Sequence, residues 1–233
     1  MVMPRAEGAH EFLDGPVPPA DLAASLRDID RLNAWFGGYA LTLREVERLA
    51  RGVPPSRRLV VLDVGGGRGD LAVRLVRWAR RGGRQIRVLV LERDADTLGL
   101  ARAVCRAYPE ILLVRADATA LPFPEGTVDV VTCALTLHHL EPDRAVAGLG
   151  EMTAAARLGV VVNDLLRTRL SLALVWLTTR LLRCHPISRS DGPLSVRRAY
   201  SPEEIRTLGE KAALRRLTIQ RYPALGRLVA IAS

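Results

Sequence analysis

The sequence predicts an α/β fold in which helices cover both faces of a doubly wound, mostly parallel sheet of seven strands. Three observations favour this arrangement. Short apolar runs, of the kind that form strands buried on both faces, recur along the chain. Segments with the helical spacing of apolar residues alternate with these runs. A glycine-rich turn joins the first run to a helix, at the edge where an open α/β sheet binds its ligand.

The segment before the first apolar run is expected to be helical, after a flexible arm. Residues 1–20 are polar and rich in proline, so we expect a loose N-terminal arm there. Helical spacing begins at Asp21, a suitable N-cap, and Gly37-Gly38 separates a first helix from a second one. Residues 21–52 are therefore expected to form two helices.

From residue 59 onward, strands and helices alternate. The expected strands cover residues 59–62, 86–91, 111–114, 128–133, 160–162, 217–220 and 228–231. The expected helices cover residues 70–81, 95–107 and 166–183, and two more begin at Glu141-Pro142 and at Ser201, which starts a capping box. We expect residues 185–200 to form a loop. Residues 21–233 are then one domain, and the segments 21–52 and 166–200 cap its site.

Composition and charge exclude several classes of protein. Hydrophobic residues make up 48% and charged residues 25% of the 233 residues, which is typical of a globular domain. The net charge is +9, but the arginines are spread along the chain, so a nucleic-acid partner is not expected. Three cysteines without a CxxC pair argue against disulfides and a metal site. Without a signal peptide or an apolar run long enough to span a bilayer, a cytoplasmic location is expected.

The glycine-rich turn carries the strongest functional signal. Residues 63–69 read Asp-Val-Gly-Gly-Gly-Arg-Gly, and Asp70 opens the helix that follows. A dinucleotide fingerprint would place its third glycine at position 70, where the Asp70 carboxylate would instead oppose a pyrophosphate. The Asp-x-Gly-x-Gly-x-Gly pattern resembles the first motif of class I S-adenosylmethionine (SAM)-dependent methyltransferases. SAM has no phosphate, and its sulfonium and amino group are cationic, so carboxylates nearby are favourable.

Later segments resemble the same family, in the family's order and spacing. The resemblance covers about residues 55–165 and implies a Rossmann-like fold, with SAM as cofactor and S-adenosylhomocysteine as product. It implies that Glu92 takes the ribose hydroxyls and that Asp117 accepts from the adenine amino group. The Leu-Thr-Leu-His-His-Leu run of residues 135–140 also recurs in the family after the fourth strand. The implied cofactor-binding residues are Asp63, Gly65, Gly67, Gly69, Glu92, Arg93, Asp117, Ala118 and Leu135.

Two side chains are candidates for catalysis. His138 can accept a proton near neutral pH, so it is the preferred base for an acceptor hydroxyl. The alternative is that His138 only orders its loop or packs on the methionyl part of SAM. Asp164, at the end of the fifth strand, is a second candidate base or an acceptor-binding group, and its alternative role is to cap the next helix. His139 is expected to pack or to bind the backbone.

An apolar stretch after the fifth strand, together with aromatic residues of the first helices, predicts a tunnel for a lipophilic acceptor. Plain core or a homodimer interface is the alternative. Arginines around this stretch suit an acidic substrate, a carrier protein or an anionic membrane face, and otherwise form a solvated rim. The candidate acceptor-binding residues are Trp35, Tyr39, His139, Trp176 and Asp191. The surrounding arginines are Arg180, Arg183, Arg189, Arg197 and Arg198.

The whole chain is similar to small bacterial O- or C-methyltransferases of quinone and polyketide biosynthesis. The resemblance rests on the Trp35-Phe36-Gly37-Gly38 entry and on residues 189–195. It implies a small phenolic, quinol or polyketide acceptor of secondary metabolism, methylated on oxygen. C-methylation of the quinone type and RNA methylation are the alternatives, the latter supported only by the charge. A non-enzymatic partner protein with the same fold is a third alternative.

Overall fold

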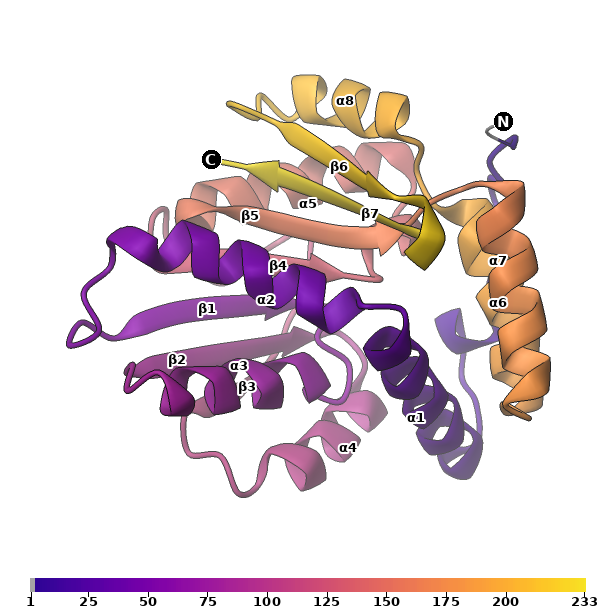
Figure 1. Cartoon of the computed structure of the whole chain (residues 1–233), viewed down its shortest axis with the longest axis horizontal. Coiled ribbons are helices and arrows are strands. Elements are labelled where there is room, and N and C mark those ends of the chain that lie inside the picture. Colours follow the sequence, from indigo (N-terminus) through magenta and orange to yellow (C-terminus); the bar gives the residue numbers. More distant parts are fainter. Residues whose placement is uncertain (1–2) are drawn as a thin grey trace.

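A computed structural model describes residues 3–233 and shows a seven-stranded sheet between layers of helices (Figure 1). The strand order is β3-β2-β1-β4-β5-β7-β6. Strand β7 runs in the direction opposite to the other six strands and pairs with β5 and β6 in antiparallel fashion. The predicted doubly wound, mostly parallel sheet is confirmed. The strands are β1 (Leu59–Val64), β2 (Ile86–Glu92), β3 (Ile111–Arg115), β4 (Val128–Ala134), β5 (Ala156–Leu165), β6 (Thr218–Tyr222) and β7 (Arg227–Ala232).

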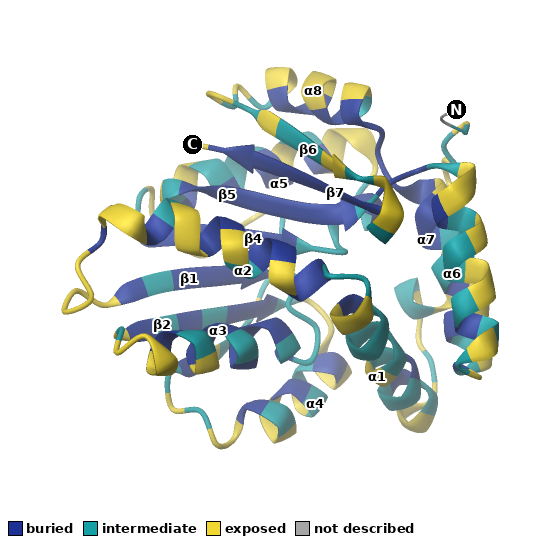
Figure 2. Ribbon diagram, viewed as in Figure 1, coloured by how far each residue is buried: buried dark blue, intermediate teal, exposed yellow. Residues whose placement is uncertain are grey.

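Helices cover both faces of this sheet, and each face has its own apolar core. Buried side chains of α2 and α3 pack on one face, and those of α5 and α8 pack on the other. The central strands β1 and β4 are buried over most of their length, as their mostly apolar sequences require (Figure 2). The helices are α1 (Pro19–Trp35), α2 (Gly38–Leu49), α3 (Asp70–Arg81), α4 (Ala95–Cys105), α5 (Pro142–Ala155), α6 (Arg169–Leu181), α7 (Pro186–Arg198) and α8 (Pro202–Lys211).

Three helices stand at the end of the sheet to which the parallel strands point. Figure 1 shows α1, α6 and α7 beyond the carboxyl ends of β1, β4 and β5. Within residues 3–233, none of these or the other helices is long and apolar enough to cross a membrane. Of the segments 21–52 and 166–200, α1, α6 and α7 thus lie at this end, whereas α2 packs on a face of the sheet, and that these segments cap a site stays a prediction.

The prediction of a loop over residues 185–200 is wrong, because this segment contains α7. Pro186 stands at the first helical position, and the His185 ring accepts a hydrogen bond from the Ile187 amide. The helix continues through Pro193, which reads in the sequence as a helix breaker. This helix start was not identified from the sequence.

The N-terminal segment also differs from the expected loose arm. Residues 1–2 lie outside the described part, and residues 3–18 make defined contacts with the cap. The Asp191 carboxylate accepts hydrogen bonds from the backbone amides of Phe12 and Leu13. The Ala6 amide donates to the Arg197 carbonyl. These partners lie on α7, which the sequence analysis did not foresee as a helix, so nothing in the sequence indicated where the arm would bind.

Candidate functional site

The glycine-rich turn links β1 to α3 and leaves room for a ligand at one point. Gly65, Gly67 and Gly69 have φ angles of 67°, 55° and 79°, a left-handed conformation that favours glycine. A Cβ atom on Gly65 would lie 2.3 Å from the Thr136 hydroxyl oxygen, and one on Gly69 would lie 2.5 Å from the Cys105 sulfur. A Cβ on Gly67 would meet no atom within 4 Å. The turn is thus packed from behind and open at Gly67.

Two carboxylates stand at the ends of the strands beside this turn. Asp63 is buried in β1, and Thr132 donates a hydrogen bond of 2.8 Å to its Oδ1, while Oδ2 has no partner. Burial, together with the charge of Glu92, raises the pKa of Asp63 to about 7. Glu92, at the end of β2, accepts hydrogen bonds from the amides of Gly67, Arg93 and Asp94. The Glu92 carboxylate therefore lies against the open point of the turn.

Three further implied cofactor residues follow β3 and β4. Asp117 accepts hydrogen bonds from Thr119 and from the Arg144 guanidinium, at 2.8 Å for the latter. Burial opposes ionisation, but these hydrogen bonds outweigh it and lower the pKa of Asp117 to about 2. Ala118 is half-buried and adjacent. Leu135 follows β4 with a φ of 54°, and its amide donates to the Asn163 carbonyl.

His138 and Asp164 form a buried pair at the carboxyl ends of β4 and β5. The His138 Nδ1 atom lies 2.7 Å from Asp164 Oδ1, and Asp164 Oδ2 accepts from the His138 amide. Burial alone would raise the pKa of Asp164, but the charge and hydrogen bonds of His138 lower it. Because an ionised carboxylate only accepts, Nδ1 of His138 carries a proton, and in the neutral form of the ring the lone pair is on Nε2. Asp164 therefore orients His138, and its own oxygens are occupied.

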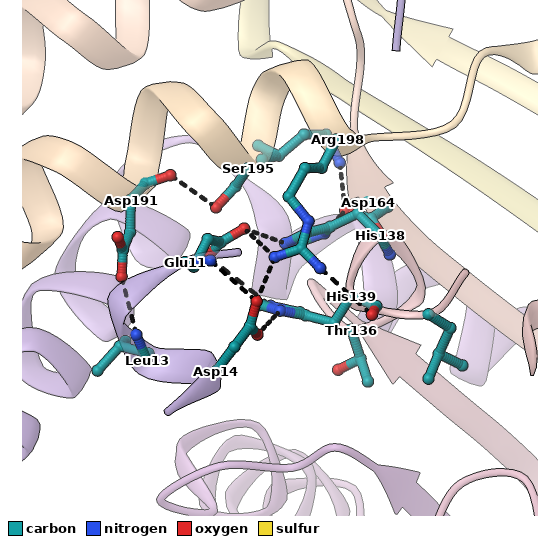
Figure 3. Close-up of polar contacts among 12 residues, drawn as sticks. Glu11, Leu13, Asp14, Thr136, His138, His139, Asp164, Asp191, Ser195 and Arg198 are labelled. Carbon is teal, nitrogen blue, oxygen red and sulfur yellow. Dashed lines mark hydrogen bonds and ion pairs between the residues drawn. The ribbon is translucent and has the colours of Figure 1, made fainter. Parts of the chain in front are cut away.

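The N-terminal arm brings further titratable groups to this histidine. Figure 3 shows Glu11 and Asp14 of the arm facing His138, His139 and Arg198. His139 Nδ1 lies 2.7 Å from Asp14 Oδ1, and Arg198 of α7 pairs with both Glu11 and Asp14. Burial raises the pKa of Glu11 to about 7, although the charges of His139 and Arg198 oppose this shift.

The pKa of Asp14 shifts in the direction opposite to that of Glu11. Burial alone would raise the pKa of Asp14, but hydrogen bonds from His139, the Glu11 amide and Arg198 lower it. Glu11 and Asp14 are the functional candidates that the sequence analysis missed. The only local signal was an acidic pair flanking Phe12-Leu13 in a proline-rich segment, and it named no partner.

The candidate acceptor-binding residues lie in different environments. Trp35 is 64% exposed and Trp176 is 49% exposed, with the Arg180 guanidinium 4.2 Å from the Trp176 ring centre. These tryptophans therefore do not line an enclosed tunnel. Tyr39 is buried, and its hydroxyl donates to Asp30. Asp191 is occupied by the amides of the arm, as described above. His139 is the member of the set that lies beside the His138 and Asp164 pair.

The arginines named from the sequence also separate. Arg198 lies among Glu11, Asp14, His138 and His139, which together form the histidine cluster. Arg183, in contrast, lines an open hollow between α1 and the turn from α6 to α7. That hollow is also lined by Arg27, Asp28, Arg31 and His185. The outer face of α6 is exposed and apolar (Figure 2). Its exposed members include Leu170, Trp176, Leu177 and Leu181.

Sequence comparison identifies the type of the central region. Residues 61–159 match a family described as "Methyltransferase domain". A demethylmenaquinone methyltransferase of Beutenbergia cavernae is 37% identical over 110 residues, which are 47% of this chain and 40% of that protein. A ubiquinone/menaquinone biosynthesis C-methyltransferase of Brucella suis is 36% identical over 93 residues, 37% of this chain and 33% of that protein. The chain thus spans about two fifths or less of the length of these relatives.

Solved structures share the fold over almost the whole chain. A SAM-dependent methyltransferase from Aquifex aeolicus superposes with a TM-score of 0.64 at 17% identity, covering 93% of this chain and 98% of that one. The magnesium protoporphyrin IX methyltransferase of Synechocystis, solved with bound S-adenosylhomocysteine, gives a TM-score of 0.57 at 16% identity. That match covers 97% of this chain and 89% of the other. The turn of residues 65–69 and Glu92 thus belong to a fold that this chain shares with these solved structures.

Proposed function

We propose that this chain, which carries a methyltransferase domain of the SAM-dependent class over residues 61–159, methylates a small lipophilic acceptor at the carboxyl edge of its sheet. The observation that carries the proposal is the placement of the Glu92 carboxylate on the amide of Gly67, the one point of the glycine-rich turn with open space. His138 follows β4, whose carboxyl end lies beside that of β1, and its buried partner Asp164 lies at the carboxyl end of β5.

The cofactor site follows from the chemistry of these groups. Glu92 would exchange its bonds with backbone amides for bonds with the ribose hydroxyls, which a carboxylate accepts in pairs. The Glu92 carboxylate places negative charge beside the turn, which favours the cationic sulfonium and amino group of SAM. The Asp117 carboxylate would accept a hydrogen bond from the adenine amino group, which would compete with the Arg144 guanidinium for this carboxylate. Gly65 and Gly69 shape the turn from behind, where Cβ atoms would clash.

His138 is the proposed proton acceptor. When bound, SAM supplies an electrophilic methyl carbon, and S-adenosylhomocysteine is released as the leaving group. Asp164 holds Nδ1–H of His138, so Nε2 is the atom that can take the proton of an acceptor hydroxyl as its oxygen forms the bond to the methyl carbon. The protonated ring is stabilised by the adjacent Asp164 carboxylate. The other contribution of the chain is to align the two reactants.

A phenolic or quinol acceptor, including one of polyketide origin, suits this arrangement. The His138 base favours transfer to oxygen, since a phenol must lose its proton as it attacks. Transfer to carbon is the second candidate, because one matched relative is named a demethylmenaquinone methyltransferase and others are named ubiquinone/menaquinone biosynthesis C-methyltransferases. A quinol carbon becomes nucleophilic when the neighbouring hydroxyl is deprotonated, so the same His138 nitrogen would serve both reactions.

Calorimetric titration with SAM and with S-adenosylhomocysteine tests the cofactor site first. The wild-type chain is expected to bind in the micromolar range, about −8 kcal/mol. Glu92→Gln keeps the size of the side chain but loses the charge, and it should weaken binding at least tenfold. Glu110→Gln is the matched control. Glu110 directly precedes β3, at the end of the sheet away from Glu92, and pairs with Arg80 on the surface. If the folded wild-type chain binds neither compound, the proposal is incorrect.

A further inference from the structure

Three metal-binding side chains converge where the N-terminal arm crosses the end of the sheet. His138 Nε2 lies 3.7 Å from Glu11 Oε1, and His139 Nε2 lies 4.0 Å from Glu11 Oε2. One ligand atom from each of the three residues lies within 4.8 Å of the others. Around a tetrahedral Zn²⁺ with bonds of about 2.0–2.1 Å, ligand atoms are roughly 3.4 Å apart. Shifts of a few tenths of an ångström to about 1.4 Å would therefore close the three atoms around one cation.

Both histidines are already oriented as metal ligands. His138 Nδ1 is bound to Asp164 and His139 Nδ1 is bound to Asp14, each at 2.7 Å. Histidines that bind metals usually donate their other ring nitrogen to a carboxylate or a carbonyl, which fixes the tautomer and the ring direction. With Nδ1 of each ring held in this way, the Nε2 atoms of both rings lie within 4.0 Å of the Glu11 carboxylate oxygens (Figure 3).

The charge of the cluster favours a divalent cation. Three carboxylates, those of Glu11, Asp14 and Asp164, contact the two imidazoles, and the Arg198 guanidinium pairs with two of these carboxylates. In the form that binds a metal, with Glu11 ionised and both imidazoles neutral, negative charges therefore outnumber positive ones in the cluster. Glu11, His138 and Asp164 are buried, so water compensates this excess poorly.

We propose that Glu11, His138 and His139 form a binding site for a divalent transition-metal cation, with Asp14 and Asp164 as the carboxylates that hold the ligands. Imidazole and carboxylate donors in this ratio suit Zn²⁺ and other first-row ions and do not suit Mg²⁺, which prefers oxygen ligands. Three protein ligands leave one position of a tetrahedral ion open. A bound ion would fasten the N-terminal arm to the loop after β4. The site goes beyond the proposed methyl transfer and does not depend on it.

Direct metal titration tests the site. Metal-free protein competes with a chromophoric chelator for Zn²⁺, and Co²⁺ is added separately to record the absorption bands of a tetrahedral ion. We expect one Zn²⁺ per chain and no response to Mg²⁺. Glu11→Gln and His139→Gln should each weaken Zn²⁺ binding at least tenfold, and Asp14→Asn should weaken it about 10- to 100-fold. His10→Gln is the matched control, because His10 is exposed next to the cluster, and its variant should bind as the wild type does.

Circular dichroism of each metal-free variant verifies that the fold is intact, and Asp14→Asn provides a second route should Glu11→Gln be unstable. The proposal is overturned if the wild-type chain binds no Zn²⁺, or if Glu11→Gln and His139→Gln bind it as tightly as the wild type. SAM titration on the same samples separates the two proposals. A chain that binds SAM but not Zn²⁺ contradicts the metal site alone, and a chain that binds Zn²⁺ but not SAM contradicts the methyl transfer alone.

Discussion

The Nδ1 atom of His138 lies 2.7 Å from Oδ1 of Asp164, across the ends of two adjacent parallel strands, β4 and β5. The same carboxylate also accepts from the amides of His138 and Leu165. It is therefore a fixed acceptor that selects one tautomer of the ring. A base that acts through Nε2 depends on that choice, because the other tautomer would place a proton on the reacting nitrogen.

Asp164→Asn should consequently slow methyl transfer more than it affects cofactor binding. An amide at this position can donate to Nδ1 and so favour the unproductive tautomer. We expect kcat to fall by about 10²- to 10⁴-fold, the usual contribution of a general base. The affinity for SAM, measured by calorimetry, should change by less than threefold. Asp143→Asn, an exposed acid on α5, is the control. An unchanged kcat in Asp164→Asn would exclude the base role of His138.

Two alanine substitutions in the glycine-rich turn should have different effects. Both Gly65 and Gly67 have positive φ angles, which cost alanine roughly 1–2 kcal/mol. At Gly65 the new Cβ would also lie 2.3 Å from the Thr136 hydroxyl oxygen, so Gly65→Ala should lower the free energy of unfolding further. The loss of unfolding free energy in Gly67→Ala should stay close to the strain cost alone. This variant should instead lose affinity for SAM, because its Cβ enters the open space. Urea denaturation and calorimetry measure the two effects, and equal losses of stability would contradict this interpretation.

The buried carboxyl of Asp63 should make stability depend on pH. Its pKa is raised from 3.8 to about 7 in the folded chain. Between these values the folded state holds a proton that the unfolded state releases, so the contribution of Asp63 to stability falls as the pH rises from about 4 to about 7, and then levels off. Asp63→Asn has no such proton. Urea denaturation at pH 5 and pH 8 should therefore show the variant gaining stability relative to the wild type at the higher pH. A constant difference would show that Asp63 ionises normally.

Zinc should inhibit methyl transfer if both proposals hold. A cation on His138 Nε2 uses the lone pair that would otherwise accept the proton of the acceptor. Activity should fall as Zn²⁺ fills one site per chain, and a chelator such as EDTA should restore it. The ratio of the rates with and without Zn²⁺ should be nearer to one in Glu11→Gln than in the wild type. Undiminished activity at full occupancy would mean that His138 does not act as the base in the metal-bound form.

The sequence predicted those parts of the structure in which local patterns coincide with the final packing. The helix expected over residues 70–81 is α3, because a glycine turn, an acidic start and apolar spacing all agree there. The strands that end near Asp63 and Glu92 were located because each is a mostly apolar run followed by polar or glycine residues. The prediction was wrong over residues 185–200, where Gly192 and Pro193 suggest a loop and tertiary contacts of α7 with α6 and the arm maintain a helix.

The histidine cluster shows where local patterns stop being informative. His138 and Asp164 were named because each follows an apolar strand, and parallel strands end at a common edge. Glu11 and Asp14 follow no such element. Their positions are set by Arg198 and Asp191, which lie more than 170 residues further along the chain. A single sequence contains no periodicity that reports contacts of this range.

The contact between the arm and α7 also sets an order of events during synthesis. Glu11 and Arg198 are 187 positions apart, so the arm leaves the ribosome long before its partner exists. At roughly 5–20 residues per second, the intervening chain takes on the order of 10–40 s to make. Until then, the exposed Phe12 and its acidic neighbours have no docking surface on α7. The arm is therefore made before α7 but reaches its place only after it, and a nascent chain can pair β1 to β5 before Arg198 has joined Glu11 and Asp14.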